Sequence, residues 1–323
     1  MQHIDYVIGI DSGGTHYRLK AADLHGTVLG EYVGTPANHH QMSRQEMLDR
    51  IDRHVDALLA QFGGSRAEAQ ALVCGTTGLD SDEEGLMLQA LYEGIAGFSC
   101  PMRIMNDAEL AHYTVTGGEG ILVICGTGSI AYGRNSAGRT ARAGGWLFTI
   151  MGDEGSGAWI SRMALRHLGR YFDGAVAQSP LVRLTRGRLD LESRNDLIEL
   201  SRRMGTQPWF TPQLGQTVDE AAAQGDGTAI EILKTAAHHV FGVVEDLVVA
   251  LQMDGEDSFK LGLWGSTILR SPVLKRTFLE LVHERYPHVE VRYADKQAVD
   301  GAVDLALSMC RAGGNCNADG CHR

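Results

Sequence analysis

The sequence predicts an α/β protein made of two duplicated lobes with a cleft between them. Two short turns, rich in glycine and hydroxyl side chains, indicate the duplication: Gly9–Thr15 and Ile124–Ser129. Each turn follows an apolar strand and precedes a second strand-like run, Tyr17–Ala22 in one case and Ile130–Gly133 in the other. A unit that recurs in both halves of a chain indicates internal repetition, although the likeness here lies in topology and turn chemistry rather than residue identity.

The composition fits a globular protein with two domains. The 323 residues exceed the usual size of one compact domain, 44% are hydrophobic, and only 7 are prolines. A net charge of −11 without a basic stripe argues against a nucleic acid partner. The most apolar long stretch, residues 240–251, contains Glu245 and Asp246, and the start has no signal-peptide pattern. We therefore expect no membrane association and a cytoplasmic location.

The first lobe is expected at residues 1–112. Ser43 and Glu46 have the spacing of a capping box, so a helix begins there, and its apolar periodicity runs to Leu59. The remaining elements of this lobe are expected as strands near 5–11, 17–23, 27–33, 71–75 and 103–105, and a helix through 86–95.

The second lobe is expected at residues 113–296 and repeats the opening pattern. Its elements are expected as strands at 120–125, 130–134, 139–143, 260–264 and 289–293, and helices at 152–169, 228–251 and 274–284. Residues 173–225 look like a helical insertion. A closing helix at 297–310 is expected to return to the first lobe, and residues 311–323 form a flexible tail.

The first turn has the residues of a phosphate site. Gly13 and Gly14 allow backbone N–H groups to approach an anion, and Thr15 adds a hydroxyl donor. Asp11 ends a strand, where its carboxylate could hold Mg²⁺ through water. The alternative is an ordinary hairpin with an Asx turn.

The second turn has the same chemistry. Gly126, Thr127 and Gly128 follow an apolar strand, and two such turns at matching places are less easily explained by chance. A further glycine, Gly265, lies between a strand and a helix, where it could let an adenine ring rest against the backbone. Trp264 beside it is alternatively a packing residue.

Asn106 and Asp107 end the last strand of the first lobe. A carboxylate at the carboxyl end of a strand, beside a crevice, is well placed to act as a general base. The alternative is that Asp107 caps the helix that begins at Ala108. The two roles use the same side chain and would compete.

Two glycine-rich stretches of the second lobe could hold a small polar ligand. They are Gly144–Trp146 and Gly152–Gly157, the latter with the carboxylates Asp153 and Glu154. The alternative for these acids is helix capping and interaction with the helix dipole.

Three cysteines in the tail, Cys310, Cys316 and Cys321, precede His322 and leave two readings open. Their spacing is wider than that of usual zinc sites, so a flexible tail with idle thiols competes with a zinc site. For His39 and His40 the sequence favours loop polarity over a metal site.

Taken in order, these motifs resemble those of the N-acetylglucosamine kinase group, in the BadF/BadG/BcrA/BcrD branch of the actin-like, sugar kinase and heat-shock ATPase superfamily. The resemblance covers most of residues 5–310 and is weakest in 173–225. Ala37–His39 looks like the sugar-contacting loop of the family, and Gly301–Val303 like the start of its closing helix. The resemblance implies ribonuclease H-like lobes and an ATP-dependent kinase that phosphorylates N-acetylglucosamine at its 6-hydroxyl.

The resemblance also implies a set of site residues. Asp107 is the implied catalytic base, with ATP and Mg²⁺ as cofactors, an amino sugar as substrate and a homodimer as the assembly. The implied ATP and phosphate residues are Asp11, Gly13, Gly14, Thr15, Gly126, Thr127, Gly128 and Gly265, with Asp11 holding Mg²⁺ through water. The implied substrate residues are Asn38, Thr77, Asn106, Asp107, Gly145, Trp146 and Asp153.

The chain departs from the family pattern at three places. Leu147 stands where a glycine is usual, one extra residue lies between Trp146 and Asp153, and Trp264 replaces a common glycine. The first two bear on sugar specificity and the third on nucleotide preference.

Three other functions remain open at this point. Glucosamine kinase is the nearest, because Asp153 or Glu154 could pair with a free ammonium group. An iron–sulfur activator would need cluster ligands, yet no cysteine follows Cys125 until Cys310. A sugar-sensing repressor would need an added DNA-binding segment and a basic face.

Overall fold

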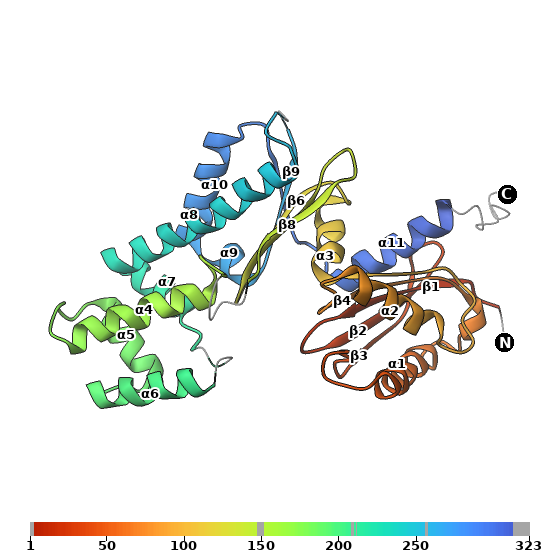
Figure 1. Cartoon of the computed structure of the whole chain (residues 1–323), viewed down its shortest axis with the longest axis horizontal. Helices are drawn as coiled ribbons and strands as arrows, with labels where there is room; N and C mark the ends of the chain where they lie inside the picture. The colour runs from red at the N-terminus through yellow and green to blue at the C-terminus, as the bar shows by residue number, and fades with distance from the viewer. Residues whose placement is uncertain (1–2, 147–151, 208–209, 211, 256–257, 313–323) are drawn as a thin grey trace. The chain divides into compact units, whose positions relative to one another are not determined.

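The computed structural model describes residues 3–146, 152–207, 210, 212–255 and 258–312. Its backbone contacts divide the chain into two compact units. Unit 1 comprises residues 1–118 together with 294–323, and unit 2 comprises residues 119–293. Unit 1 is therefore assembled from both ends of the chain, whereas unit 2 is continuous (Figure 1).

Unit 1 contains a mixed five-stranded sheet with the order β3-β2-β1-β4-β5. The strands are β1 (Tyr6–Ser12), β2 (Tyr17–Asp23), β3 (Val28–Gly34), β4 (Ala69–Thr76) and β5 (Met102–Asn106). The first three are joined by antiparallel pairing, and β4 and β5 run parallel to β1. Parallel neighbours need crossover connections, which is why helices separate β3, β4 and β5 in the sequence.

Helices cover both faces of this sheet. The helices of unit 1 are α1 (Arg44–Leu59), α2 (Asp82–Glu93), α3 (Asp107–Thr116) and α11 (Ala298–Ala312), with a short 3₁₀ turn η1 (Arg66–Glu68). Ile8 and Ile10 of β1 point to one face and share a core with Met47 of α1. Helix α11 packs on β1, β4 and α3. A Cβ on Gly9 would lie 2.7 Å from the Val299 carbonyl oxygen, so α11 requires glycine there.

Unit 2 repeats the sheet of unit 1. Its order is β10-β9-β6-β7-β8, built from β6 (Gly120–Cys125), β7 (Ser129–Arg134), β8 (Thr140–Gly144), β9 (Lys260–Trp264) and β10 (Glu290–Tyr293). Strands β6, β7 and β8 pair antiparallel, and β9 and β10 run parallel to β6. The predicted duplicated α/β fold is confirmed, because each unit has the same strand order and the same pairing directions.

The helices of unit 2 form a larger layer around α8. They are α4 (Gly157–Phe172), α5 (Pro180–Leu189), α6 (Arg194–Thr206), α7 (Gly215–Ala223), α8 (Gly227–Ala250), α9 (Ser266–Arg270) and α10 (Pro272–Arg285). Helix α8 packs against α4, α7 and α10 and against β6, β7 and β8. The segment 173–225 contains α5, α6 and α7, and α5 and α7 pack on each other.

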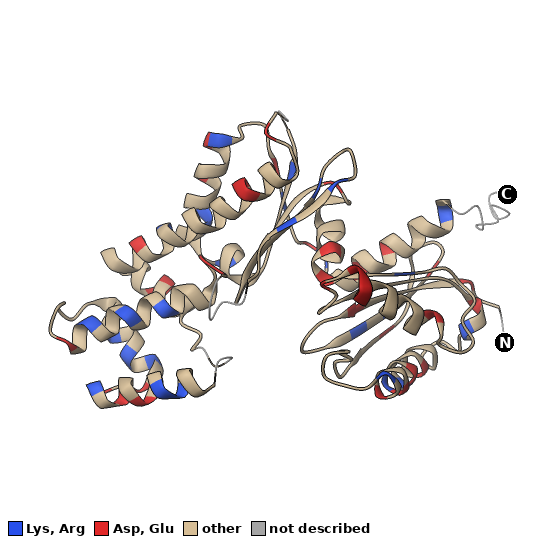
Figure 2. Ribbon diagram, viewed as in Figure 1, with Lys and Arg blue, Asp and Glu red and all other residues tan. Residues whose placement is uncertain are grey.

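Basic residues gather on α5 and α6 of this segment although the whole chain is acidic (Figure 2). Arg186 on α5 pairs with Glu192 at 2.6 Å, and its guanidinium also lies over the rings of Tyr171 and Phe172. Arg194 at the start of α6 pairs with Asp173 at 3.2 Å. These cations therefore have local partners within unit 2.

Two boundaries differ from the expected ones. The expected division at residues 112/113 lies inside α3, and the two units divide after Gly118. The helix expected from Gly152 begins at Gly157 instead, because Asp153 has a φ of 62° and residues before Ser156 form a turn. The expected tail lies, from residue 313 onward, outside the described residues. Among the helices that are described, none combines the length and apolar character needed to cross a bilayer.

Candidate functional site

The predicted residues of unit 1 meet at one edge of its sheet, where three parallel strands end. The register places Ser12 beside Thr76, and Thr76 beside Asn106. The Thr77 N–H donates to the Ser12 carbonyl oxygen at 2.9 Å and ties the first two strand ends together. Ligand sites of open α/β sheets lie outside the carboxyl ends of the strands, so this edge is the candidate site of unit 1.

Asp11 lies on β1 directly opposite Arg18 on β2. The Arg18 guanidinium donates to Asp11 Oδ2 at 3.3 Å. Burial raises the pKa of Asp11, and the nearby Arg18 opposes that rise only in part. The Asp11 carboxylate is therefore a group that could hold Mg²⁺ through water.

The first turn has open space above its glycines. A Cβ on Gly14 would meet nothing within 4 Å, and one on Gly13 would meet only the His16 carbonyl oxygen at 3.7 Å. Packing therefore does not demand glycine at either position, whereas close approach of a ligand to the backbone would. The Gly13 N–H donates to the His16 carbonyl at 3.0 Å, so this amide closes the turn. Thr15 Oγ1 lies 2.9 Å from His16 Nδ1.

The residue that caps α3 is Asn106, which corrects the alternative that Asp107 is the cap. Asn106 Oδ1 accepts the Ala108 N–H at 2.8 Å, and Asn106 Nδ2 donates to the Leu79 carbonyl at 2.9 Å. Asp107 is the first residue inside the helix. Capping therefore does not depend on Asp107, because the Asn106 side chain does it.

The pKa of Asp107 is raised, and burial is the largest cause. The negative charges of Asp11 and Asp80 raise it further. Hydrogen bonds from the Ala108 N–H and the Thr77 hydroxyl to the Asp107 carboxyl oppose the rise. A carboxylate with a raised pKa is a stronger proton acceptor than an exposed one, so this environment suits a general base.

The loop after β3 carries Asn38. Ser12 Oγ donates to the Ala37 carbonyl at 3.4 Å, which links the loop to the end of β1. Asn38 Oδ1 accepts the His40 N–H at 2.8 Å in an Asx-type turn. The Asn38 side-chain oxygen thus shapes the loop. The Asn38 side-chain nitrogen is the group that could donate a hydrogen bond to a sugar hydroxyl.

The second turn lies at the matching edge of unit 2. The register pairs Ile124 with Trp264, so Gly126 and Gly265 both follow neighbouring strand ends. Gly265 has a φ of 105°, and a Cβ there would lie 2.4 Å from the Cys125 carbonyl oxygen. Close contact between the two strand ends therefore explains Gly265 without any ligand.

Helices α4 and α9 donate hydrogen bonds to the backbone carbonyl groups of the second turn. The Gly126 carbonyl accepts the Gly157 N–H at 2.8 Å and the Thr267 hydroxyl at 2.7 Å. The Thr127 carbonyl accepts the Ala158 N–H at 3.0 Å, and the Gly126 N–H donates to the Gly128 carbonyl at 2.9 Å. A Cβ on Gly126 would meet nothing within 4 Å. The turn is thus fixed on one side and open at Gly126.

Asp153 supports this turn rather than capping α4. Its Oδ1 accepts the Ser129 N–H at 2.7 Å, and the Ser129 hydroxyl donates to the Glu154 carbonyl at 2.9 Å. A Cβ on Gly128 would lie 2.9 Å from the same Asp153 oxygen, so glycine is needed for that contact. The cap of α4 is Ser156, which corrects the alternative that the two acids cap the helix.

Gly145 and Trp146 follow β8. Gly145 has a φ of 72°, and its N–H donates to the Ser129 carbonyl at 3.0 Å. The Trp146 side chain is 54% exposed, with the Arg142 guanidinium 5.5 Å from its ring centroid. An exposed aromatic ring is available to a ligand. Leu147 lies outside the described residues.

Sequence reasoning missed three supporting residues. Arg18, Ser129 and Thr267 hold Asp11, Asp153 and the Gly126 carbonyl respectively. Arg18 could have been found by counting across the first hairpin, since Asp11 and Arg18 are equidistant from its turn. Thr267 is 141 positions from Gly126, and nothing in the sequence joins the two.

Duplicated units of this topology, each with an open glycine turn at its strand ends, define an actin-like ATPase fold of the ribonuclease H type. The model of the BadF/BadG/BcrA/BcrD ATPase family matches residues 8–307. The chain belongs to the BadF/BadG/BcrA/BcrD ATPase family, as the sequence motifs predicted.

Two curated relatives match over nearly their whole length. The N-acetylmuramic acid/N-acetylglucosamine kinase of Clostridium acetobutylicum is 34% identical over 309 residues, which cover 94% of this chain and 99% of that protein. The N-acetyl-D-glucosamine kinase of Dictyostelium discoideum is 29% identical over 311 residues, 93% of this chain and 97% of that protein.

Solved structures agree on the fold. A candidate N-acetylglucosamine kinase from Chromobacterium violaceum has a TM-score of 0.70 and 24% identity, covering 95% of this chain and 100% of that one. A ROK family glucokinase from Streptomyces griseus, in complex with glucose and AMPPNP, has a TM-score of 0.54 and 17% identity over 95% of this chain and 100% of that one.

Proposed function

We propose that this protein is an ATP-dependent amino-sugar kinase that phosphorylates N-acetylglucosamine at its 6-hydroxyl. The observation that carries the proposal is Asp107, a partly buried carboxylate at the strand edge whose pKa is raised and which the helix cap does not use. The kinases named above, 34% and 29% identical over nearly the whole chain, support the same reaction class.

Asp107 would accept the proton of the attacking sugar hydroxyl. Phosphoryl transfer depends mainly on positioning and on stabilising charge, so the residue need only hold the hydroxyl in line and take its proton. Thr77 would orient the Asp107 carboxylate through its hydroxyl. Asn38 and Asn106 lie on neighbouring loop and strand ends of the same unit and would contact sugar hydroxyls.

Magnesium would supply positive charge to the phosphates when bound. Asp11 is the residue that would hold it through water, because its pKa is raised by burial and Arg18 compensates only in part. The open backbone at Gly13, Gly14 and Gly126 would receive the phosphates of ATP, and Gly128 would complete the second turn around them. The Thr15 and Thr127 hydroxyls would add donors.

The second unit would supply the remaining sugar contacts from Gly145, Trp146 and Asp153. Asp153 accepts the Ser129 N–H through Oδ1 and would add a carboxylate contact to a sugar hydroxyl. Gly265 would let the nucleotide base approach the end of β9. The enzyme would act in the cytoplasm on a small-molecule substrate and as a homodimer.

A kinase assay with Asp107→Asn tests the proposal. The parent and the variant are assayed with ATP and a panel of N-acetylglucosamine, N-acetylmuramic acid and glucosamine. We expect kcat for the preferred sugar to fall by about 10²-fold or more, the range of a lost general base. Asp82→Asn, an exposed carboxylate at the start of α2, is the matched control and should keep full activity.

Two results would refute the mechanism or the reaction. A folded Asp107→Asn variant with the parental kcat would show that Asp107 is not the general base. A parent protein that phosphorylates none of the sugars would show that the protein is not a kinase for amino sugars. The ratio of kcat/KM values between the three sugars chooses the acceptor, including N-acetylmuramic acid, which the name of the Clostridium relative includes.

A further inference from the structure

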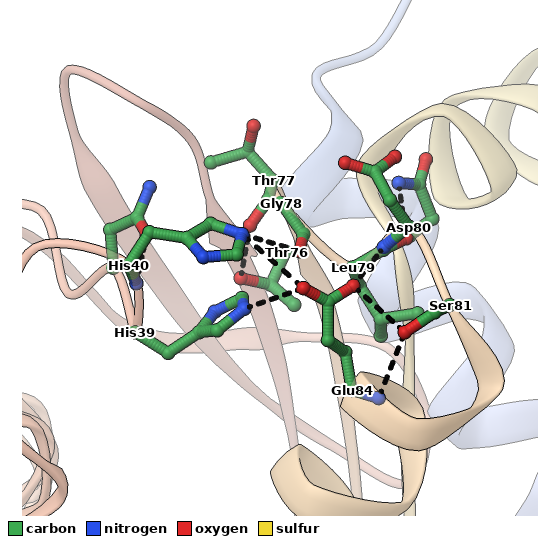
Figure 3. Close-up of polar contacts among 11 residues, drawn as sticks. His39, His40, Thr76, Thr77, Gly78, Leu79, Asp80, Ser81 and Glu84 are labelled. Atoms are coloured by element: carbon green, nitrogen blue, oxygen red, sulfur yellow. Dashed lines mark hydrogen bonds and ion pairs between the residues drawn. The ribbon is translucent and has the colours of Figure 1, made fainter.

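Two histidines and a glutamate of unit 1 converge although they come from distant parts of the chain. His39 and His40 lie in the loop after β3, and Glu84 lies in the first turn of α2. One ligand atom from each lies within 4.8 Å of the other two. Figure 3 shows both imidazole rings turned toward the Glu84 carboxylate.

The distances suit a metal ion better than direct bonding. Glu84 Oε1 lies 3.6 Å from His39 Nε2 and 3.4 Å from His40 Nε2. These separations exceed those of good hydrogen bonds. Ligand atoms about 2.0–2.1 Å from a tetrahedral Zn²⁺ are about 3.3 Å apart, close to both separations.

The burial of the His39 ring also favours a role as a metal ligand. Its side chain is only 10% exposed, and neither ring nitrogen has a hydrogen bond. A buried polar group without a partner is costly and rare in native proteins. A metal ion bound at Nε2 would satisfy one of its two ring nitrogens.

The Glu84 carboxylate is already oriented for such a role. Its Oε2 accepts the Asp80 N–H at 2.8 Å and the Ser81 hydroxyl at 3.2 Å, while Oε1 faces both histidines. Hydrogen bonds to the outer oxygen of a ligating carboxylate are the usual way in which proteins orient a metal ligand.

The two imidazole rings lie against each other. The His39 and His40 ring centroids are 4.0 Å apart with an interplanar angle of 39°. This packing places a nitrogen of each ring on the side of Glu84, and imidazole nitrogen is a common metal ligand. His40 Nε2 also lies 3.2 Å from the Gly78 carbonyl oxygen, which is the contact that metal binding would replace.

We propose that His39, His40 and Glu84 form a binding site for a divalent transition metal of the Zn²⁺ type, with water in a fourth position. The site joins the loop after β3 to the start of α2 and is separate from the Mg²⁺ role assigned to Asp11. It does not depend on the proposed kinase activity. Since Asn38 precedes His39, a bound ion fixes the loop that carries Asn38.

Zinc binding by the full chain tests the site. The background is the Cys316→Ser/Cys321→Ser variant, which removes the tail thiols as competing ligands. After removal of metal with EDTA and gel filtration, Zn²⁺ is titrated by calorimetry and bound zinc is counted by elemental analysis. We expect one equivalent of Zn²⁺, and binding at least tenfold weaker in His39→Ala, His40→Ala and Glu84→Gln.

Controls separate this site from general binding and from misfolding. His25→Ala removes an exposed histidine elsewhere in unit 1 and should leave the affinity unchanged. Zn²⁺ should raise the Tm of the background protein but not that of Glu84→Gln, and Co²⁺ should give a four-coordinate visible spectrum only in the former. Parental zinc affinity in the His39→Ala and Glu84→Gln variants, or no bound zinc in the background protein, would overturn the proposal.

Discussion

At the scale of single residues, the Asp107 carboxylate lies in a buried environment that disfavours its negative charge. Burial and the charge of Asp11 raise the pKa of Asp107 above the ordinary aspartate value of 3.8. Between 3.8 and the raised value, the folded chain binds more protons than the unfolded chain. The free energy of unfolding therefore falls as the pH rises through that window, and it stays lower at every pH above it.

Removing this charge should stabilise the protein at neutral pH. We expect Asp107→Asn to raise the free energy of unfolding at pH 7 on the order of 1 kcal/mol, as is common for residues that serve activity at the expense of stability. The gain should shrink as the pH approaches 3.8. Urea unfolding at several pH values measures it, with Asp82→Asn as the control that shows no gain. A less stable Asp107→Asn variant at pH 7 would contradict the charge argument.

The sequence predicted which polar residues end the strands but not how they share roles. Asn106 and Asp107 are equally good caps, so the choice depends on a one-residue difference in where α3 begins. Asp153 has a φ of 62°, and its carboxylate accepts the Ser129 N–H. No local sequence pattern predicted this backbone conformation. Glu84 lies more than forty positions after His39 and His40 in the sequence. No local sequence pattern could therefore predict that the three residues form the proposed metal site.

At the scale of elements, two glycines of the first hairpin serve opposite purposes. Gly9 lies beneath α11, where a Cβ would lie 2.7 Å from both the Val299 carbonyl oxygen and the Val303 nitrogen. Gly14, five residues later, has nothing within 4 Å of a Cβ. The first glycine is needed for packing, and the second is open to the proposed phosphate.

The corresponding alanine variants should separate stability from activity. Gly9→Ala must move α11 or β1 and should lower the free energy of unfolding by about 1–3 kcal/mol. Gly14→Ala should change it by less than about 0.5 kcal/mol and instead raise KM for ATP. Urea unfolding and steady-state kinetics measure the two effects. An equally destabilised Gly14→Ala, or an unchanged KM for ATP, would remove the proposed distinction.

Element positions were largely predictable, because strands and helices here have clear hydrophobic periodicity. The capping box of Ser43 and Glu46 is present as expected and opens α1. The start of α4 was predicted wrongly, since Gly152–Gly155 looks like a helix opening but forms a turn closed by the Ser156 N–H to the Asp153 carbonyl at 3.1 Å. Glycine-rich turns and helix starts share residue types, so composition alone does not distinguish them.

At the scale of the whole molecule, the two units depend differently on chain continuity. Unit 2 is one continuous segment, residues 119–293, with its own apolar core around α8. Unit 1 needs α11, which covers β1, β2 and β4 and carries buried residues along most of its length. The sequence predicted that a closing helix returns to the first lobe, and it could not show how much of the sheet that helix covers.

Fragments of the chain should therefore differ in stability. We expect residues 119–293 to fold alone with a cooperative thermal transition, and residues 1–118 to lack one, because the face of β1 and β4 that α11 covers is left exposed to water. Adding a peptide of residues 294–312 should restore the transition of the 1–118 fragment. Circular dichroism melts measure each case. A cooperative transition in residues 1–118 alone would show that α11 is dispensable.

The discontinuity of unit 1 also reverses the usual order of events on the ribosome. Domains commonly fold in the order in which they are synthesised, with the N-terminal one first. Here every residue of unit 2 leaves the ribosome before α11 does, so the unit that begins the chain is the last to be completed. The edge that holds Asp11 and Asp107 therefore reaches its final form only after unit 2 has been synthesised in full, and a nascent chain stalled before α11 would carry a finished second unit beside an unfinished first one.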